Sequence, residues 1–148
     1  MTTEPKIETL PGSSQTISPL VSICIPNYNG AEYIEECIRS VLSQERDYGI
    51  EIILHDDAST DESLQIIRTQ FPQVEVLASK ENVGFCISNN RMVAHSRGKY
   101  VLLLNNDAVL RAGSLKAFRD YAEKQPIQGI LGLPQYTLYD GSLVDRGY

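Results

Sequence analysis

The sequence of 148 residues has few cysteines, and their number and spacing argue against any crosslinking role. Cys24, Cys37 and Cys86 are an odd number, lie far apart and include no Cys-x-x-Cys pair. We therefore expect neither a disulfide framework nor a zinc site, and the reducing cytoplasm is the expected location. Cys24 and Cys37 fall within apolar patterns and are interpreted as small core residues.

Clustered basic residues are also missing. The chain has 13 Lys and Arg against 19 Asp and Glu, a net charge of −6, and no basic run. Binding to the phosphate backbone of nucleic acid is therefore not expected. An acidic protein still binds an anionic ligand when backbone N–H groups or a bridging cation meet the phosphates, so the charge does not exclude a nucleotide.

Long apolar runs and several well-known binding motifs are absent too. No apolar run exceeds five residues, which is far too short to span a membrane, and the N-terminus lacks the features of a signal peptide. The sequence has no Gly-x-Gly-x-x-Gly after its first predicted strand, no phosphate-binding Gly-x-x-x-x-Gly-Lys-Ser/Thr loop and no Gly-x-Ser-x-Gly elbow. A dinucleotide-binding fold, a P-loop fold and an acyl-transfer nucleophile are thereby disfavoured.

The composition, with 42% hydrophobic and 22% charged residues, is that of one globular domain. Residues 1–19 are rich in Thr, Ser, Pro and Gly and predict a flexible leader, so the domain covers 20–148. Strands are expected at 20–25, 50–54, 74–77, 100–104, 130–133 and 135–139, and helices at 31–44, from 60 or 61 to 70, at 85–96 and at 114–124. This alternation predicts an α/β fold in which helices cover both faces of a mostly parallel sheet.

Polar residues gather just after three of the predicted strands. Residues 26–29 are Pro-Asn-Tyr-Asn, residues 55–57 are His-Asp-Asp and residues 105–107 are Asn-Asn-Asp. Because ligands of open parallel sheets bind at the carboxyl ends of the strands, these segments form the candidate site. Carboxylates gathered there repel one another unless a cation is present. Mg²⁺ or Mn²⁺, held by one or two carboxylates and by ligand phosphates, would let this acidic protein bind a diphosphate.

Simpler interpretations of the same residues stay open. Asp and Asn after a strand form turns and cap helices, and for any single segment that interpretation is favoured. Asp61 is expected to cap a helix, and nothing near His55 or His95 in the sequence indicates a metal site. A phospho-acceptor signalling domain also has acids at its strand ends and stays an alternative, although the Lys that it predicts after a late strand has no clear candidate here.

Taken together and in this order, the segments resemble those of family 2 inverting glycosyltransferases. Residues 21–29 are similar to the opening strand and Pro-x-Tyr-Asn loop of that family, and residues 55–61 to its Asp-Asp-Gly-Ser-Thr-Asp motif. Residues 81–85 resemble its Asn-x-Gly-Phe loop, and residues 89–90 the polar pair of the next helix. Residues 104–107 resemble the strand that carries its Asp-x-Asp metal motif, so the match runs from about residue 20 to residue 139.

The resemblance implies a GT-A fold, a Rossmann-like three-layer αβα sandwich, that binds a nucleotide-sugar donor. By analogy, Pro26 and Tyr28 line the nucleoside pocket and Asp57 contacts the base. Asp107 would bind Mn²⁺ or Mg²⁺, which bridges the diphosphate and, as a Lewis acid, stabilises the charge on the leaving group. The other residues that the resemblance places against the nucleotide sugar are Asn27, Asp56, Asn82, Asn89, Asn90, Asn105 and Asn106.

Two departures from the family pattern bear on function. The metal motif begins with Asn105 where the family has Asp, so metal affinity is expected to be lower or to rest mainly on Asp107. Asn at this position is similar to rhamnosyltransferase-like members of the family, which favours dTDP-rhamnose or a UDP-sugar as the donor. The family's catalytic base lies in a later acceptor-binding region, whereas Asp140 and Asp145 are interpreted as turn and surface residues. We therefore expect the chain to be truncated before that region, with the base outside it.

The expected function is transfer of a sugar, with inversion, from a UDP- or dTDP-sugar to a hydroxyl of a glycan or glycolipid in cell-surface polysaccharide synthesis. Because the base is expected outside this chain, the prediction of an enzyme does not require the fragment to be active by itself. The alternative is a nucleotide-sugar-binding module without turnover. Neither a membrane-spanning segment nor a nucleic-acid partner is expected, while peripheral membrane association of the full protein stays open.

Overall fold

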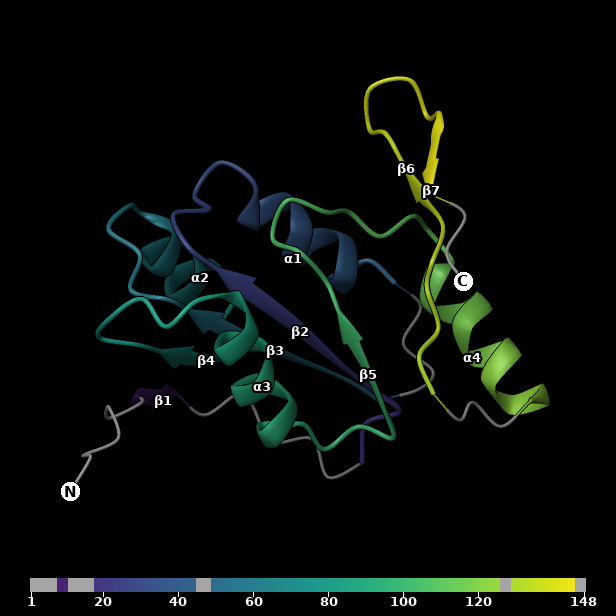
Figure 1. Ribbon diagram of the computed structural model, residues 1–148, viewed down its shortest axis with the longest axis horizontal. Helices are drawn as coiled ribbons and strands as arrows, with labels where there is room; N and C mark the ends of the chain where they lie inside the picture. Colours follow the sequence, from purple (N-terminus) through teal and green to yellow (C-terminus); the bar gives the residue numbers. More distant parts are fainter. Residues whose placement is uncertain (1–7, 11–17, 45–48, 126–128, 146–148) are drawn as a thin grey trace. The chain divides into compact units, whose positions relative to one another are not determined.

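The computed structural model describes residues 8–10, 18–44, 49–125 and 129–145 (Figure 1). The chain divides into two compact units, residues 1–114 and residues 115–148. Every polar segment of the candidate site belongs to the first unit.

The first unit is built on a five-stranded sheet with the order β1-β4-β3-β2-β5 (Figure 1). Its strands are β1 (Glu8–Leu10), β2 (Val21–Asn27), β3 (Ile50–Asp56), β4 (Glu75–Ala78) and β5 (Tyr100–Leu103). The strand β2 pairs in parallel with both β3 and β5, and β3 pairs in parallel with β4. The carboxyl ends of β2, β3 and β5 therefore meet at one edge of the sheet, where the segments that follow them come together.

The strand β1 lies in the part of the sequence that predicts a flexible leader. Its backbone pairs antiparallel with β4, with Glu8 opposite Ala78 and Leu10 opposite Val76. This strand is absent from the predicted elements, so the sequence analysis missed it. The open backbone groups along the free edge of β4 explain this pairing, because such an edge accepts a further strand. Residues 1–7 and 11–17 of the leader lie outside the described residues.

Helices on both faces of the sheet confirm the three-layer αβα arrangement. The helices of the first unit are α1 (Ile34–Leu42), α2 (Ser63–Gln70) and α3 (Phe85–His95). Cys24, Ile53 and Leu77 form a fully buried cluster with Met92 of α3, so α3 covers one face. The alternate residues of β2 and β3 point to the opposite face and are buried as well. Helices α1 and α2, which contact each other, cover that face.

Local sequence explains where these helices form. In α1 the buried positions Ile34, Cys37, Ile38 and Val41 follow the i, i+3, i+4 spacing of an amphipathic helix. The helix α2 ends at Gln70, because the residue before Pro72 is disfavoured in helical conformation.

At the amino ends of the strands, Glu51 joins β3 to the segment between α3 and β5. Its carboxylate accepts hydrogen bonds from the backbone N–H of Arg97 at 2.6 Å, from the Arg97 guanidinium at 2.8 Å and from the Ser22 hydroxyl. Burial raises the pKa of the Glu51 carboxyl, but the hydrogen bonds from Ser22 and Arg97 outweigh it, so its pKa lies below the ordinary value. A Cβ at Gly98 would lie 2.5 Å from the backbone nitrogen of Ser22, so glycine is needed at this close approach.

The second unit contains all but the first residue of α4 (Ser114–Lys124) and an antiparallel hairpin of β6 (Gln135–Tyr136) and β7 (Leu143–Asp145). The strand predicted at 130–133 is not formed, because two glycines and Pro134 interrupt the apolar segment, and Ile130 is 99% exposed. The turn predicted at 140–141 is confirmed, with Gly141 at a φ of 71°. Within the described ranges, none of the helices has the length and apolarity needed to cross a lipid bilayer.

Candidate functional site

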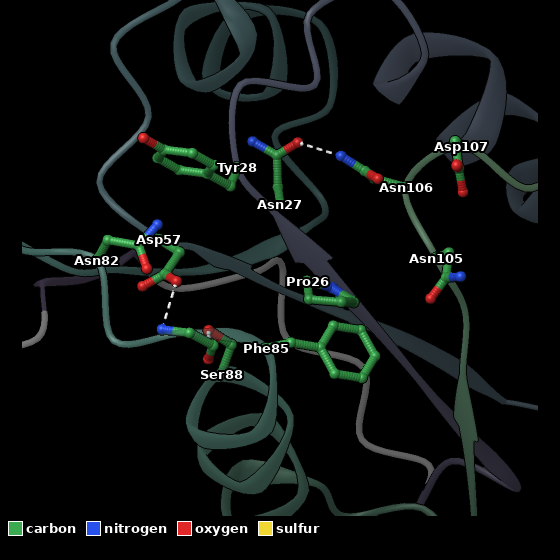
Figure 2. A pocket seen from close by; sticks show the side chains of 11 residues that line it. Pro26, Asn27, Tyr28, Asp57, Asn82, Phe85, Ser88, Asn105, Asn106 and Asp107 are labelled. Atoms are coloured by element: carbon green, nitrogen blue, oxygen red, sulfur yellow. Dashed lines mark hydrogen bonds between the residues drawn. The ribbon is translucent and has the colours of Figure 1, made fainter.

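A pocket of about 390 Å³ opens at the edge of the sheet where β2, β3 and β5 end (Figure 2). Its volume falls within the range of roughly 300–1,000 Å³ that is typical of small-molecule sites. The last residues of β2, the segments after β2, β3 and β5, the loop between β4 and α3, and the start of α3 line it. The lining residues are Pro26, Asn27, Tyr28, Asp57, Asn82, Gly84, Phe85, Ser88, Asn105, Asn106 and Asp107.

Most of the residues that the sequence analysis assigned to the site lie in this lining. They are Pro26, Asn27, Tyr28, Asp57, Asn82, Asn105, Asn106 and the predicted metal ligand Asp107. The ring of Tyr28 is prominent among them, because this residue is 53% exposed and leaves an aromatic face available to a ligand (Figure 2).

Asp56, also assigned to the site from the sequence, lies outside the lining of the pocket. It is 1% exposed, and its carboxylate accepts hydrogen bonds from Asn27 Nδ2 at 2.9 Å and from the Ser59 backbone N–H at 3.1 Å. Successive side chains at the end of a strand point in different directions, so Asp57 enters the pocket and Asp56 does not. Asp56 therefore supports the loops around the pocket from within the protein.

The start of α3 contributes Phe85 and Ser88 to the pocket instead of the predicted Asn89 and Asn90. Asn89 is 6% exposed and donates to the Phe85 carbonyl at 2.9 Å, whereas Asn90 lies on an exposed side of the helix. Phe85 and Ser88 are three residues apart, the spacing of one helical face, and this spacing was the available signal for the missed residues. Gly84, which precedes them, was also missed as a lining residue.

The carboxylate of Asp57 holds the loop that leads into α3. Its two oxygens accept hydrogen bonds from the backbone N–H groups of Val83 at 2.7 Å and Gly84 at 2.8 Å. Gly84 has a φ of 86°, which glycine adopts without steric cost. Two N–H donors thus compensate the charge of Asp57, and the clamped loop keeps Asn82 in the lining.

Hydrogen bonds also crosslink the loops after β2 and β3. The Asn29 Oδ1 accepts from the backbone N–H of Thr60 at 2.8 Å, and the backbone N–H of Ala31 donates to Asp61 at 2.8 Å. Asp61 also accepts the N–H of Ser63, the first residue of α2, at 3.0 Å. The residue that caps α2 is Glu62, without a side-chain cap hydrogen bond, so Asp61 acts one residue earlier than a cap and joins the two loops into one connected wall beside the pocket.

Asp107 supplies an exposed carboxylate to the pocket beside the amide of Asn105. On the nearby helix α1, burial raises the pKa of the Cys37 thiol to about 12, and the negative charge of Asp107 makes a smaller contribution in the same direction. In the parts of the chain that the structure describes, no three His, Cys, Asp or Glu side chains group to hold a metal by themselves. The oxygens of Asp107 and Asn105 fit a Mg²⁺ or Mn²⁺ ion that takes one protein carboxylate and completes its shell with ligand phosphates and water.

The histidines take no part in this pocket. His55 is fully buried beneath α3, with Nε2 at 3.2 Å from the Ser79 hydroxyl and at 3.4 Å from the Arg91 guanidinium. Burial lowers the pKa of the His55 imidazole, and the charge of Arg91 adds to this effect while Asp57 opposes it.

Comparison with proteins of known sequence gives one family. Residues 22–146 match the family model described as "Glycosyl transferase family 2". The chain is 31% identical over 134 residues to a chondroitin synthase of Pasteurella multocida, covering 88% of this chain and 14% of that protein. It is 36% identical over 146 residues to the putative teichuronic acid biosynthesis glycosyltransferase TuaG of Bacillus subtilis, covering 84% of this chain and 57% of that protein.

Solved structures share the fold. The mannosyltransferase PcManGT from Pyrobaculum calidifontis, in complex with GDP-Man and Mn²⁺, superposes with a TM-score of 0.65 at 26% identity, covering 80% of this chain and 37% of that one. TarS 1-349 of S. aureus, in complex with UDP-GlcNAc, superposes with a TM-score of 0.64 at 22% identity, covering 80% of this chain and 41% of that one. The expected GT-A fold is thereby confirmed. The strand-end segments, the fold and the family match agree, and the chain belongs to glycosyltransferase family 2.

Proposed function

We propose that this chain is the donor-binding part of an inverting glycosyltransferase that takes its sugar from a UDP- or dTDP-sugar. The observation that carries the proposal is the pocket at the carboxyl ends of β2, β3 and β5, which gathers an aromatic ring, a clamped carboxylate and a free-standing pair of amide and carboxylate oxygens. Two proteins of the same fold were solved with a nucleotide sugar, which supports a donor of this class.

Different parts of the pocket suit different parts of such a donor. Pro26 and the exposed ring of Tyr28 offer apolar surface to the nucleoside, and the remaining lone pairs of Asp57 accept hydrogen bonds from the base. The amides of Asn82 and Asn105 supply donors and acceptors toward ribose and sugar hydroxyls.

A divalent cation, Mn²⁺ or Mg²⁺, completes the proposal. Asp107 would hold it with help from the Asn105 amide oxygen, and when bound the cation supplies Lewis-acid stabilisation of the diphosphate leaving group. The role of this chain is then to bind the nucleoside and to orient the diphosphate toward Asp107. The relative solved with GDP-Man contains Mn²⁺, which supports a metal of this kind.

The acceptor, we propose, is a hydroxyl of a glycan or glycolipid in surface polysaccharide synthesis, with the reaction in the cytoplasm and peripheral membrane association of the full protein. The names of the chondroitin synthase and of TuaG support a polymer acceptor, and the three free cysteines are consistent with a reducing compartment. We leave the catalytic base unassigned. The hydrogen bond from Thr137, together with those from Ser142, lowers the pKa of Asp140 to about 2, so Asp140 is a weak base at neutral pH.

Calorimetric titration of the folded chain with UDP and with dTDP, each with and without Mn²⁺, tests the proposal. We expect one of them to bind, and Mn²⁺ to strengthen binding by about tenfold or more. The variant Asp107→Ala should lose this gain, because it removes the carboxylate that holds the cation. Glu36→Gln, which removes an exposed charge on α1, is the matched control and should keep it. If the folded chain binds neither UDP nor dTDP, the proposal is contradicted.

A binding module without turnover is the second candidate, favoured by one observation. Asn105 offers a neutral amide oxygen where the family motif has a carboxylate, and this weakens the expected hold on a cation. Such a module would bind the donor without hydrolysing or transferring it. Donor hydrolysis and transfer by the full-length protein distinguish the two candidates, since only the enzyme releases a free nucleotide diphosphate in an Asp107-dependent manner.

A further inference from the structure

The middle residue of the Asn-Asn-Asp segment, Asn106, points away from its two neighbours. Its Nδ2 donates a hydrogen bond of 3.0 Å to Oδ1 of Asn27 at the end of β2 (Figure 2). We propose that Asn106 is a positioning residue, which locks the segment of Asn105 and Asp107 against β2 so that both face the diphosphate of the donor. This inference rests on the proposed function.

The partner of Asn106 is held rigidly. Asn27 is 1% exposed, and the two hydrogens of its Nδ2 are shared among Asp56 Oδ1 at 2.9 Å, Ser63 Oγ at 3.0 Å and Ser59 Oγ at 3.2 Å. These acceptors fix which way the amide of Asn27 is turned, because a rotated amide would set its oxygen against the Asp56 carboxylate. The Oδ1 of Asn27 is therefore a fixed acceptor that selects the position of the Asn106 side chain.

The loop after β2 leaves room for this contact. A Cβ placed on Gly30 would lie 2.3 Å from Asn106 Nδ2 and 2.3 Å from Asn27 Oδ1, the two atoms of the hydrogen bond. Any larger residue at position 30 would have to separate the two amides. Gly30 therefore permits the Asn27–Asn106 hydrogen bond by leaving this space open.

The backbone around Asn106 transmits the restraint to its neighbours. The N–H of Ala108 donates to the Asn105 carbonyl at 3.1 Å, which closes a turn over residues 105–108, and the Cys37 thiol approaches the same carbonyl at 3.5 Å. With Asn106 anchored at the centre of this turn, the flanking side chains of Asn105 and Asp107 keep their places in the pocket lining. Asn106 thus acts on the cation through Asp107, in the way that outer-shell partners orient metal ligands.

Calorimetry on the full chain tests this role with the nucleotide diphosphate that the wild type binds, once with Mn²⁺ and once with EDTA. In Asn106→Ala we expect the gain from Mn²⁺, about tenfold or more in the wild type, to fall to about twofold or less, as for the loss of an outer-shell partner. Gly30→Ala, which separates the two amides without removing either, should show the same loss. Gln65→Ala, which removes an exposed amide on α2, should show none. Electron paramagnetic resonance of Mn²⁺ counts the bound ion independently of heat.

Each outcome has a definite meaning. An unchanged gain from Mn²⁺ in both Asn106→Ala and Gly30→Ala, with folded variants, overturns the positioning role and leaves the proposed function intact. An equal loss of affinity with Mn²⁺ and with EDTA also overturns it, since Asn106 would then contact the nucleotide directly. Failure of the wild type to bind either UDP or dTDP overturns the proposed function and this inference with it.

Discussion

Replacement of Asp57 by Asn should release the loop before α3 while leaving the shape of the side chain almost unchanged. In the wild type the two carboxylate oxygens accept the backbone N–H groups of Val83 and Gly84 at 2.7 and 2.8 Å. In Asp57→Asn one of these oxygens becomes an NH₂ group, which cannot accept a hydrogen bond. One backbone N–H then loses its partner, and the other faces a neutral acceptor instead of a charged one.

The size of the effect follows from these two contacts. A hydrogen bond to a charged group contributes about 1.5–3 kcal/mol. Loss of one such bond should make local opening of the loop roughly 10- to 150-fold more frequent, since each 1.4 kcal/mol corresponds to a factor of ten. The change should be local, because the loop is held at one end by α3 and at the other by β4.

Amide hydrogen exchange followed by NMR measures this opening at single residues. In Asp57→Asn the amides of Val83 and Gly84 should exchange faster by the stated factor, whereas those in β2 should not. Asp61→Asn is the matched control, since it weakens the hydrogen bonds from Ala31 and Ser63 in a different loop and should leave Val83 and Gly84 protected. Unchanged exchange at Val83 and Gly84 in Asp57→Asn would refute the clamp.

Three further predictions concern stability. Glu51→Gln should lower the free energy of unfolding by about 1–3 kcal/mol at neutral pH. Because the folded-state pKa of Glu51 is lowered, the carboxylate stabilises the fold above its ordinary pKa of 4.5. Urea unfolding should therefore show the difference between wild type and variant above pH 4.5 and its loss as the pH falls below that value. The pKa of His55 is also lowered by burial, so the wild type should lose stability as pH drops below 6.5, and thermal unfolding of His55→Gln should show a shallower fall below that pH. Ala58 has a φ of 62°, so Ala58→Gly should raise the free energy of unfolding by about 0.5–1 kcal/mol, and a lowered value would contradict the strain assigned to that turn.

The sheet could be predicted where local sequence carries the pattern. The apolar runs that form β2, β3 and β5 are visible without any partner, and the parallel arrangement follows from the helices between them. The strand β1 has no such run, and its pairing with β4 joins residues more than 60 positions apart, from Leu10 to Val76. A strand that forms only because a distant edge is open leaves no local signal, which is why residues 8–10 were predicted as leader.

The candidate site shows the same division. The rule that ligands bind at the carboxyl ends of parallel strands predicts that Tyr28, Asp57 and Asp107 lie together, and all three line the pocket. The rule does not say which of two adjacent polar side chains faces the pocket. Asp56 turns inward to Asn27, and its direction depends on strand geometry that residue type alone does not give.

Chemical-shift mapping by NMR tests the central claim most directly. The ¹⁵N-labelled chain is titrated with UDP and with dTDP in the presence of Mg²⁺, which is diamagnetic and leaves the signals sharp. We predict saturable shifts concentrated on residues 26–28, 57, 82–88 and 105–107, around the pocket in Figure 2. Shifts confined to the opposite end of the strands, around Glu51 and Arg97, or no shifts with either nucleotide, would contradict a nucleotide-binding role for this pocket.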